Sequence, residues 1–385
     1  MQGEARGTPN VESHEKNSQC MAELARMYHD NLQNRGRENK DPEEREQTIN
    51  GIIEFVETKP SQSEAEAINS LISEEEVVKA LKLSDNDKAA GLDGATYKMW
   101  SSISQDRKSN GAEDTPFDVI QLMTAAFNDI ELNGTAYGPN FAEGWMCPIY
   151  KNKEKDKIEN YRPITILNTD YKLMTKVLAM RLAKSAPTLL HKIQAGFVPG
   201  RQISEQTQLL KMILNYAEVT EENGMIIALD QAKAYDRIEH DYLWMTLKAF
   251  KIPNHFIQTV KNLYSEATTK VMINGHLISS FHVTRGVRQG DPLSCLLFNL
   301  GIEALSLMLG RSNLKGLIVP RTQERLIANL FTDDTTTFLA EEDPLTDLIE
   351  ILDCWCLAAG AQFNTEKTKI IPMGSKTFRE KLIQE

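Results

Sequence analysis

The sequence lacks the features that define several protein classes. It has no apolar run approaching the roughly eighteen residues of a membrane span, and its polar first residues do not form a signal peptide. It has only five cysteines, at positions 20, 147, 295, 354 and 356. Cys354 and Cys356 are too close together for the usual zinc pair, so we expect reduced thiols in an intracellular protein that does not contact a membrane.

Basic residues are also scarce, with 43 Lys and Arg against 54 Asp and Glu, a net charge of −11. Such a charge argues against a nucleic-acid partner. The acid is concentrated in residues 1–80, which carry 17 acidic and nine basic residues, whereas residues 151–184 carry nine basic and four acidic ones. This basic strip in a nearly neutral body is compatible with contacts to phosphate groups.

The distribution of apolar residues predicts a helix-rich chain with a few short strands. Residues 1–69 are Glu-rich, and we expect an acidic, helical and partly disordered extension there. Residues 101–116 read as a polar insertion. Helices are predicted over 20–31, 46–56, 73–83, 117–132, 171–186, 204–219, 296–309 and 344–359, and through 242–247. Strands are predicted over 145–150, 162–167 and 225–229, with hairpins over 268–281 and 327–339.

The most informative stretch is 327–339, in which two strand-like runs meet at Asp333 and Asp334. An acidic pair at a bend is usually a solvated turn, but its oxygens also suit Mg²⁺. Asp230 follows the apolar run 225–229, where an isolated aspartate is more often a helix cap. If these strands are adjacent and antiparallel, the three carboxylates meet, as two Mg²⁺ ions about 4 Å apart would require for phosphoryl transfer.

Seven segments in fixed order carry a resemblance to a known family, and they comprise residues 88–94, 160–164, 194–201, 230–236, 285–297, 331–334 and 364–368. Together they resemble the motifs of a reverse transcriptase, most closely one from a non-LTR (LINE-type) retrotransposon. The similarity runs from about Met21 to the C-terminus. Ala90 and Cys295 stand where the family has proline, and Thr332 stands where it has alanine.

The resemblance implies an α+β fold of the right-hand polymerase type. Fingers would occupy residues 70–220, and a palm, an antiparallel sheet backed by helices, would occupy 221–385. The sequence ends eleven residues after Gly374. We therefore expect a chain truncated before the thumb, without an RNase H, and with nothing before residue 70 that resembles an endonuclease.

The resemblance also assigns roles to individual residues. Asp230, Asp333 and Asp334 would be the catalytic, metal-binding carboxylates, and Lys367 would protonate the leaving pyrophosphate. The nucleotide would be bound by Lys151, Lys153, Arg162, Tyr235, Gln289 and Gly290. Tyr235 would exclude a 2′-hydroxyl, although an apolar environment also suits an ordinary core aromatic. The lysines of 151–157 and Lys367 could equally be solvated loop residues.

The implied activity is RNA-directed DNA polymerisation, in which two Mg²⁺ ions (with Mn²⁺ as a substitute) add dNMPs from dNTPs to a DNA primer on an RNA template. A retroelement ribonucleoprotein would be located in the nucleus or cytoplasm. The alternative from another class is a truncated, inactive remnant that at most binds RNA or protein, favoured by the missing thumb and the acidic charge. A group II intron-type maturase and an RNA-dependent RNA polymerase rank lower, since the motif wording and Tyr235 oppose them.

Overall fold

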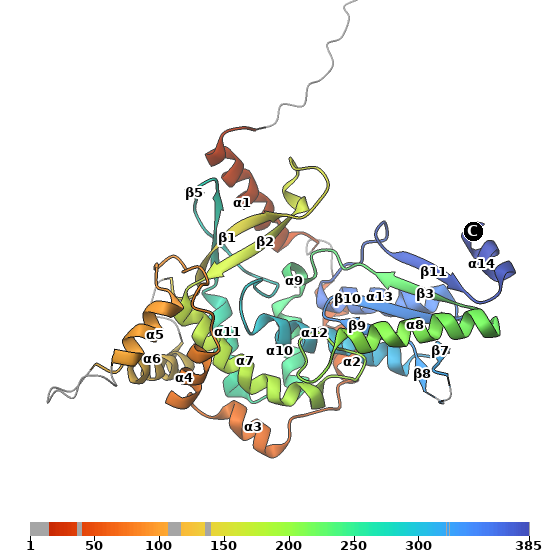
Figure 1. The fold of residues 1–385 in the computed structure, drawn as a ribbon, viewed down its shortest axis with the longest axis horizontal. Helices are drawn as coiled ribbons and strands as arrows, with labels where there is room; N and C mark the ends of the chain where they lie inside the picture. Colours follow the sequence, from red (N-terminus) through yellow and green to blue (C-terminus); the bar gives the residue numbers. More distant parts are fainter. Residues whose placement is uncertain are drawn as a thin grey trace, which may run out of the picture.

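The computed structural model describes residues 15–36, 41–106, 117–134, 140–320, 322 and 324–384 (Figure 1). The helices are α1 (Ser18–Asn34), α2 (Pro42–Ile53), α3 (Gln62–Asn69), α4 (Glu74–Lys82), α5 (Tyr97–Asp106), α6 (Val119–Asn133), α7 (Thr169–Leu189), α8 (Ile203–Thr220), α9 (Ala234–Arg237), α10 (His240–Ala249), α11 (Asn254–Ser265), α12 (Ser294–Arg311), α13 (Leu345–Ala359) and α14 (Lys376–Gln384), with a 3₁₀ turn at Ile158–Asn160. The strands are β1 (Glu143–Tyr150), β2 (Tyr161–Leu167), β3 (Gly224–Leu229), β4 (Thr268–Ile273), β5 (His276–Leu277), β6 (Phe281–His282), β7 (Leu317–Ile318), β8 (Arg325–Leu326), β9 (Ala328–Phe331), β10 (Asp334–Ala340) and β11 (Lys369–Met373).

A four-stranded sheet in the order β11–β3–β10–β9 forms the centre of the C-terminal half. All three strand pairs are antiparallel, as predicted for a palm sheet. The sequence-distant β3 and β10 are direct neighbours, with Leu229 opposite Thr335 and Ile226 opposite Phe338. This register brings the end of β3 to the start of β10.

Helices cover both faces of this sheet, and side chains that alternate along each strand enter two different cores. Ile227 and Leu339 belong to the main core with α12 and α13, whereas Ile226 and Phe338 pack with α8 and the β7–β8 pair. Because a strand buried on both faces needs apolar residues at every position, the continuous run 225–229 has a physical explanation. Figure 1 shows α8 lying across one face of the sheet.

A second sheet combines two regions of the chain. β1 and β2 form the predicted antiparallel hairpin, and β1 also pairs in parallel with β4. β4 forms the predicted hairpin with β5 at Asn274 and Gly275, which both have positive φ. The strands between 268 and 282 thus join the sheet of β1, whereas the predicted fingers–palm boundary at residue 221 assigned them to the palm. The position of that boundary stays a prediction.

Helix α12 lies at the centre of the main core. It is long and apolar enough to cross a membrane by length and composition alone, so the statement that no such stretch exists was wrong. However, 14 of its 18 residues are buried within the protein, and it packs against α7, α10 and α13. This burial is typical of the central helix of a globular core.

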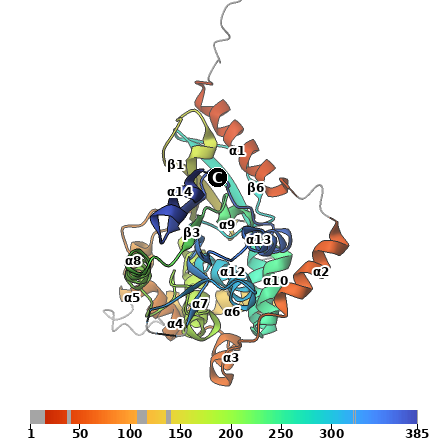
Figure 2. The same ribbon diagram turned by 90° about the vertical axis from the view of Figure 1, so that its right-hand side faces the viewer.

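The N-terminal helices pack against the rest of the described chain. α1 lies against β4, β5 and β6, and α2 packs against α10 and α13 (Figures 1 and 2). Arg45 of α2 donates hydrogen bonds to the Asp241 carboxylate and to the Ala358 carbonyl. α1 and α2 therefore form part of the polymerase-like body, which the prediction of a separate extension did not anticipate.

Several local predictions are confirmed, and others are incomplete. The capping box of Ser73 and Glu76 opens α4 with both reciprocal hydrogen bonds. Part of the predicted insertion, 101–106, belongs to α5, and 107–116 lies outside the described residues, as do 1–14 and 37–40 of the extension. The helices α3, α5, α9, α11 and α14 were not predicted.

Candidate active site

The acidic hairpin between β9 and β10 differs from its prediction by one residue. Its two-residue loop consists of Thr332 and Asp333, whereas Asp334 is the first residue of β10 and pairs with Phe331. Thr332 is buried and has φ of +59°, which places a β-branched residue in the left-handed region. In this turn Asp334 is exposed, Asp333 is partly buried and Thr332 is buried.

The three predicted carboxylates lie at neighbouring strand ends. Asp230 follows Leu229 directly, and Leu229 lies opposite Thr335, so Asp230 is level with Asp334 and next to the loop. Burial raises the pKa of Asp333, and the negative charges of Asp334 and Asp230 raise it further. The ammonium group of Lys151 opposes this rise. The predicted adjacency of the two strands is therefore confirmed, and the carboxylate of Asp333 is partly desolvated and near two other negative charges.

The segment after α13 contacts both the backbone and the side chain of Asp230. The Asn364 amide donates to the Asp230 carbonyl over 2.7 Å, and Asn364 in turn accepts from the Lys367 amide. The Lys367 Nζ lies 3.4 Å from Asp230 Oδ2, an ion-pair distance. Gln231 Nε2 donates to the Asp333 carbonyl over 3.1 Å, which links the two strand ends. The turn formed by 364–368 thus places Lys367 at the carboxylates, as the motif implied.

These residues fit a divalent cation in their chemistry. Asp230 Oδ2 accepts no hydrogen bond and has the Lys367 ammonium 3.4 Å away, and the charges of Asp334 and Asp230 raise the pKa of Asp333 beyond the effect of burial. A cation would therefore offset the repulsion among these carboxylates. Within the described ranges, no three Asp, Glu, His or Cys side chains already stand close enough to form a metal cluster. The donors are present at the right strand ends, and the ammonium of Lys367 is the positive charge closest to Asp230 Oδ2.

Tyr235 packs as a core aromatic and also lies near the carboxylates, so it has features of both alternatives, a core residue and a residue that faces the nucleotide. Its ring stacks on Phe298 of α12 with centroids 4.9 Å apart, so it is a partly buried aromatic of the core. Burial raises the pKa of its hydroxyl, and Cys295 and Asp333 are close enough to raise it further. The tyrosine therefore lies between the core and the carboxylates.

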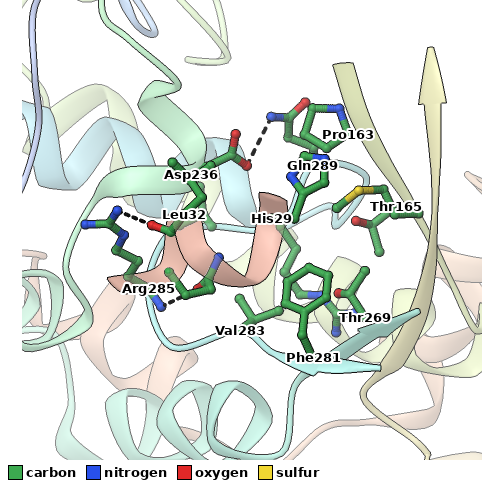
Figure 3. Close-up of a pocket in the computed structure, with 14 residues that line it drawn as sticks. His29, Leu32, Pro163, Thr165, Asp236, Thr269, Phe281, Val283, Arg285 and Gln289 are labelled. Carbon is green, nitrogen blue, oxygen red and sulfur yellow. Dashed lines mark hydrogen bonds between the residues drawn. The ribbon is translucent and has the colours of Figure 1, made fainter. Parts of the chain in front are cut away.

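The loop after β6 places Gln289 and Gly290 against the fingers hairpin. The Thr165 amide of β2 donates to the Gln289 carbonyl over 2.9 Å. Gly290 has φ of +117°, and a Cβ at this position would lie 2.3 Å from the Thr165 carbonyl oxygen, so glycine is required there. Gln289 Nε2 lies 3.4 Å from Asp236 Oδ1 and donates to it (Figure 3). Burial raises the pKa of Asp236 to about 6.

Figure 3 shows that Gln289 and Asp236 line one side of a pocket whose other side is formed by α1 and β6. His29 and Leu32 of α1 lie opposite Phe281, and burial lowers the pKa of the His29 imidazole to about 4. None of the three strand-end carboxylates lines this pocket. The pocket is therefore distinct from the carboxylate site. On its α1 side it is lined by the apolar Leu32 and by His29, which is neutral at pH 7.

The basic residues of the fingers hairpin are accessible. Lys151 and Lys153 lie in its exposed turn, and Arg162 is an exposed residue of β2 opposite Ile149. Lys151 is near enough to affect the pKa of Asp333. Lys233, which the sequence reasoning passed over, donates to the Glu159 carbonyl over 3.0 Å and so connects the hairpin to the residues after β3.

The sequence reasoning also missed the residues that support the site from behind. The Gln194 side chain accepts a hydrogen bond from the Thr332 amide in the β9–β10 loop, and Asn299 of α12 donates to the Gly196 carbonyl over 2.6 Å. Gln194 lies in a segment whose resemblance was noted, so a signal existed, but no role was assigned to it. Arg285 donates to the Leu32 and Arg35 carbonyls at the end of α1, and no motif in α1 indicated that contact.

An antiparallel sheet with three carboxylates at neighbouring strand ends and a lysine beside one of them is consistent with the palm and fingers of a polymerase. Residues 150–378, more than half of the chain, match the family described as reverse transcriptase (RNA-dependent DNA polymerase). The chain belongs to this family. The resemblance to reverse transcriptases of non-LTR retrotransposons is thereby confirmed.

The curated relatives are longer proteins of transposable elements. The chain is 30% identical over 322 residues to an uncharacterized 149 kDa protein of transposon TX1 from Xenopus laevis, which covers 82% of this chain and 23% of that protein. It is 25% identical over 291 residues to the Pol polyprotein of retrotransposable element R2 from Nasonia vitripennis, covering 75% and 26%. It is 24% identical over 302 residues to a probable RNA-directed DNA polymerase from transposon BS of Drosophila melanogaster, covering 76% and 31%. The chain spans less than a third of the length of each of these relatives.

Proposed function

We propose that this chain is the polymerase part of a non-LTR retroelement protein and adds dNMPs to a DNA primer on an RNA template. The observation that carries the proposal is the β3–β10 register, which brings Asp230 beside the Asp333 and Asp334 pair. Family membership supports a divalent metal as cofactor and an RNA template, a nucleic-acid primer and dNTPs as substrates.

The carboxylates Asp230, Asp333 and Asp334 would hold two Mg²⁺ ions, for which Mn²⁺ could substitute. When bound, these ions would activate the primer 3′-hydroxyl and neutralise the triphosphate. Burial and repulsion disfavour the carboxylate form of Asp333 and so raise its pKa, and a bound cation would stabilise that form.

Lys367 pairs with Asp230 before any metal binds, over 3.4 Å. Asp230 would help to hold the metal, and the Lys367 ammonium would donate its proton to the leaving pyrophosphate. Lys151, Lys153 and Arg162, which are exposed, would contact the triphosphate from the fingers, and the guanidinium group of Arg162 can bind phosphate through two donors.

Tyr235 is the proposed sugar selector. Its ring is fixed by stacking on Phe298, and a ring that cannot move aside excludes a 2′-hydroxyl better than a mobile one. Gln289 and Gly290 are proposed to contact the nucleotide and the template base. In the present structure Gln289 is bonded to Asp236, so this contact requires that bond to be exchanged.

The second candidate function is an inactive remnant that binds RNA or protein. Thr332 favours it, because a buried β-branched residue with positive φ stands directly before Asp333. The acidic charge favours it as well, since it weakens binding of a nucleic-acid duplex and makes it sensitive to salt. We further propose that the protein is located inside the cell, in the nucleus or cytoplasm, and does not associate with membranes.

Template and sugar specificity test the proposal. A labelled DNA primer is annealed to matched RNA and DNA templates at low salt, and extension is measured with dNTPs and with rNTPs in Mg²⁺. Extension on RNA with dNTPs is expected, together with rNTP incorporation that rises in Tyr235→Ala. Asp353→Asn, an exposed carboxylate on α13, is the control. Extension with rNTPs only would replace the proposal with an RNA polymerase, and RNA binding without extension would support the remnant.

A further inference from the structure

A buried carboxamide forms hydrogen bonds to the loop of the β9–β10 hairpin. Gln194 is fully buried, and its Oε1 accepts hydrogen bonds from the amides of Thr332 and Gly196, each over 2.9 Å. Its Nε2 lies 3.5 Å from the Thr332 carbonyl oxygen and donates toward it. A single side chain therefore bonds both polar backbone groups of the residue that precedes Asp333.

Thr332 needs such support because its own chemistry opposes its conformation. Its φ of +59° costs a β-branched residue energy that glycine would not lose. Its side chain is buried, and its Oγ1 has no hydrogen-bond partner. The left-handed turn must therefore be imposed by contacts from outside the hairpin.

The segment around Gln194 is itself fastened to the hairpin, so the carboxamide cannot drift. The Ala195 amide donates to the Leu330 carbonyl and the Leu330 amide donates to the Ile193 carbonyl, both over 2.9 Å. Gly196 lies so close to the loop that a Cβ there would meet Thr332 Oγ1 at 2.3 Å. The close approach leaves no room for water between the segment and the turn.

A second layer fixes the same segment to the helices. Arg201 donates to the carbonyls of Pro187, Leu190, His191 and Gln194 over 2.6 to 2.9 Å, and so caps the end of α7. These four bonds tie the peptide of Gln194 to a helix of the main core. The carboxamide is thus mounted on a rigid support, as a positioning group requires.

We propose that Gln194 is a positioning residue of the polymerase: its carboxamide imposes the left-handed conformation of Thr332 and thereby sets the direction of the Asp333 carboxylate. The inference rests on the proposed function, because Asp333 matters only if the chain polymerises. Gln194 does not contact substrate or metal in this scheme and acts only through the hairpin.

The test is a double-mutant cycle between Gln194→Met and Thr332→Gly. Methionine keeps the length of the side chain, but its thioether is only a weak acceptor and has no donor, so the loop loses its support. We expect kcat for primer extension to fall between about tenfold and about a hundredfold in Q194M, with the KM for dNTP nearly unchanged, because the reacting groups are misplaced. In the T332G background, the same change should cost about threefold or less, because glycine adopts this turn unaided.

The matched control is Asn128→Leu. Asn128 of α6 likewise bonds both backbone groups of one residue, accepting from the Ile72 amide over 2.7 Å and donating to the Ile72 carbonyl over 2.9 Å. Figure 1 shows α6 well separated from β9 and β10. N128L should lower the melting temperature without lowering kcat in the folded protein, and T332G should not rescue it.

Amide hydrogen exchange across 327–340 gives a second readout that does not depend on activity. Two results together support the proposal: the Thr332 amide exchanges faster in Q194M than in the parent, and T332G largely removes the effect of Q194M on kcat. Equal exchange in parent and Q194M overturns it, as does a kcat loss that T332G leaves undiminished. If the parent itself fails to extend a primer, the proposed function fails, and exchange alone then decides whether Gln194 holds the turn.

Discussion

Replacing Asp333 with asparagine should stabilise the protein when metal is absent and remove the stabilisation that metal provides. Asp333 is partly buried beside Asp334 and Asp230, and both carboxylates raise its pKa. The carboxamide has a similar shape but no charge, so the variant loses two repulsive interactions. A cluster of carboxylates that lowers stability without metal but is needed for activity is typical of a cation-binding site.

The magnitude follows from the exposure of the partners. The side chain of Asp230 is 38% exposed and Asp334 is exposed, so solvent screens both interactions. An ion pair of this kind contributes about 1 kcal/mol or less, and the two repulsions together are worth about 1 to 2 kcal/mol. We therefore expect D333N to unfold with a free energy higher by about this amount in chelator at neutral pH.

The pH dependence has a defined sign. Because the folded-state pKa of Asp333 is raised, protonation favours the folded parent, and this contribution to stability is lost as the pH rises through that pKa. The advantage of D333N over the parent should therefore be present at neutral pH and should disappear below the unfolded-state pKa of an aspartate, about 3.9.

The assay is equilibrium denaturation of parent, D333N and the surface control D353N, in chelator and with Mg²⁺ or Mn²⁺. Metal should stabilise the parent and D353N by the linkage between binding and folding, and should stabilise D333N much less. A D333N protein that is less stable than the parent in chelator, or that gains as much from metal, would refute the electrostatic reasoning.

Three further predictions concern residues around the site. Glu303 is buried in α12 with its pKa raised to about 8 by burial, so the free energy of unfolding should fall by up to about 1.4 kcal/mol per pH unit between pH 5 and pH 8, and pH-dependent denaturation of Glu303→Gln should show a flatter profile. Gly290→Ala should destabilise by about 2 kcal/mol or more because its Cβ meets the Thr165 carbonyl, whereas Gly310→Ala, with open space around it in α12, should not lower the melting temperature. Gln33→Leu removes the acceptor for the Thr284 and Arg285 amides and should therefore loosen the loop that carries Gln289. We expect a higher KM for dNTP, and an unchanged KM would count against a role for α1.

The sequence was sufficient to predict the carboxylate site because strand pairing rules act on short patterns. The apolar run before Asp230 and the two β-rich runs around Asp333 predicted three strands, and the antiparallel arrangement followed once they were assumed adjacent. The one-residue error at the hairpin has a physical cause. Two adjacent aspartates look like the turn, but the tertiary bond from Gln194 places Thr332 in it instead.

What could not be predicted depends on contacts between residues far apart in the chain. The burial of Arg285 against the carbonyls of Leu32 and Arg35 requires α1 to dock 250 residues away from its own position. A polar, Glu-rich segment gives no local signal of that docking, because a helix needs only one apolar stripe to pack. The parallel pairing of β1 with β4 is likewise a long-range contact that no hairpin signal announces.

The measurement that tests the central claim most directly is the single-turnover rate of first dNMP addition to a DNA primer on an RNA template, for the parent and for Asp333→Asn. The parent should add the nucleotide in the presence of Mg²⁺. The variant should be slower by at least about a hundredfold, because its loop keeps its shape but loses a carboxylate that holds the metal. Equal rates in the two proteins would contradict the assignment of the strand-end carboxylates as the catalytic centre.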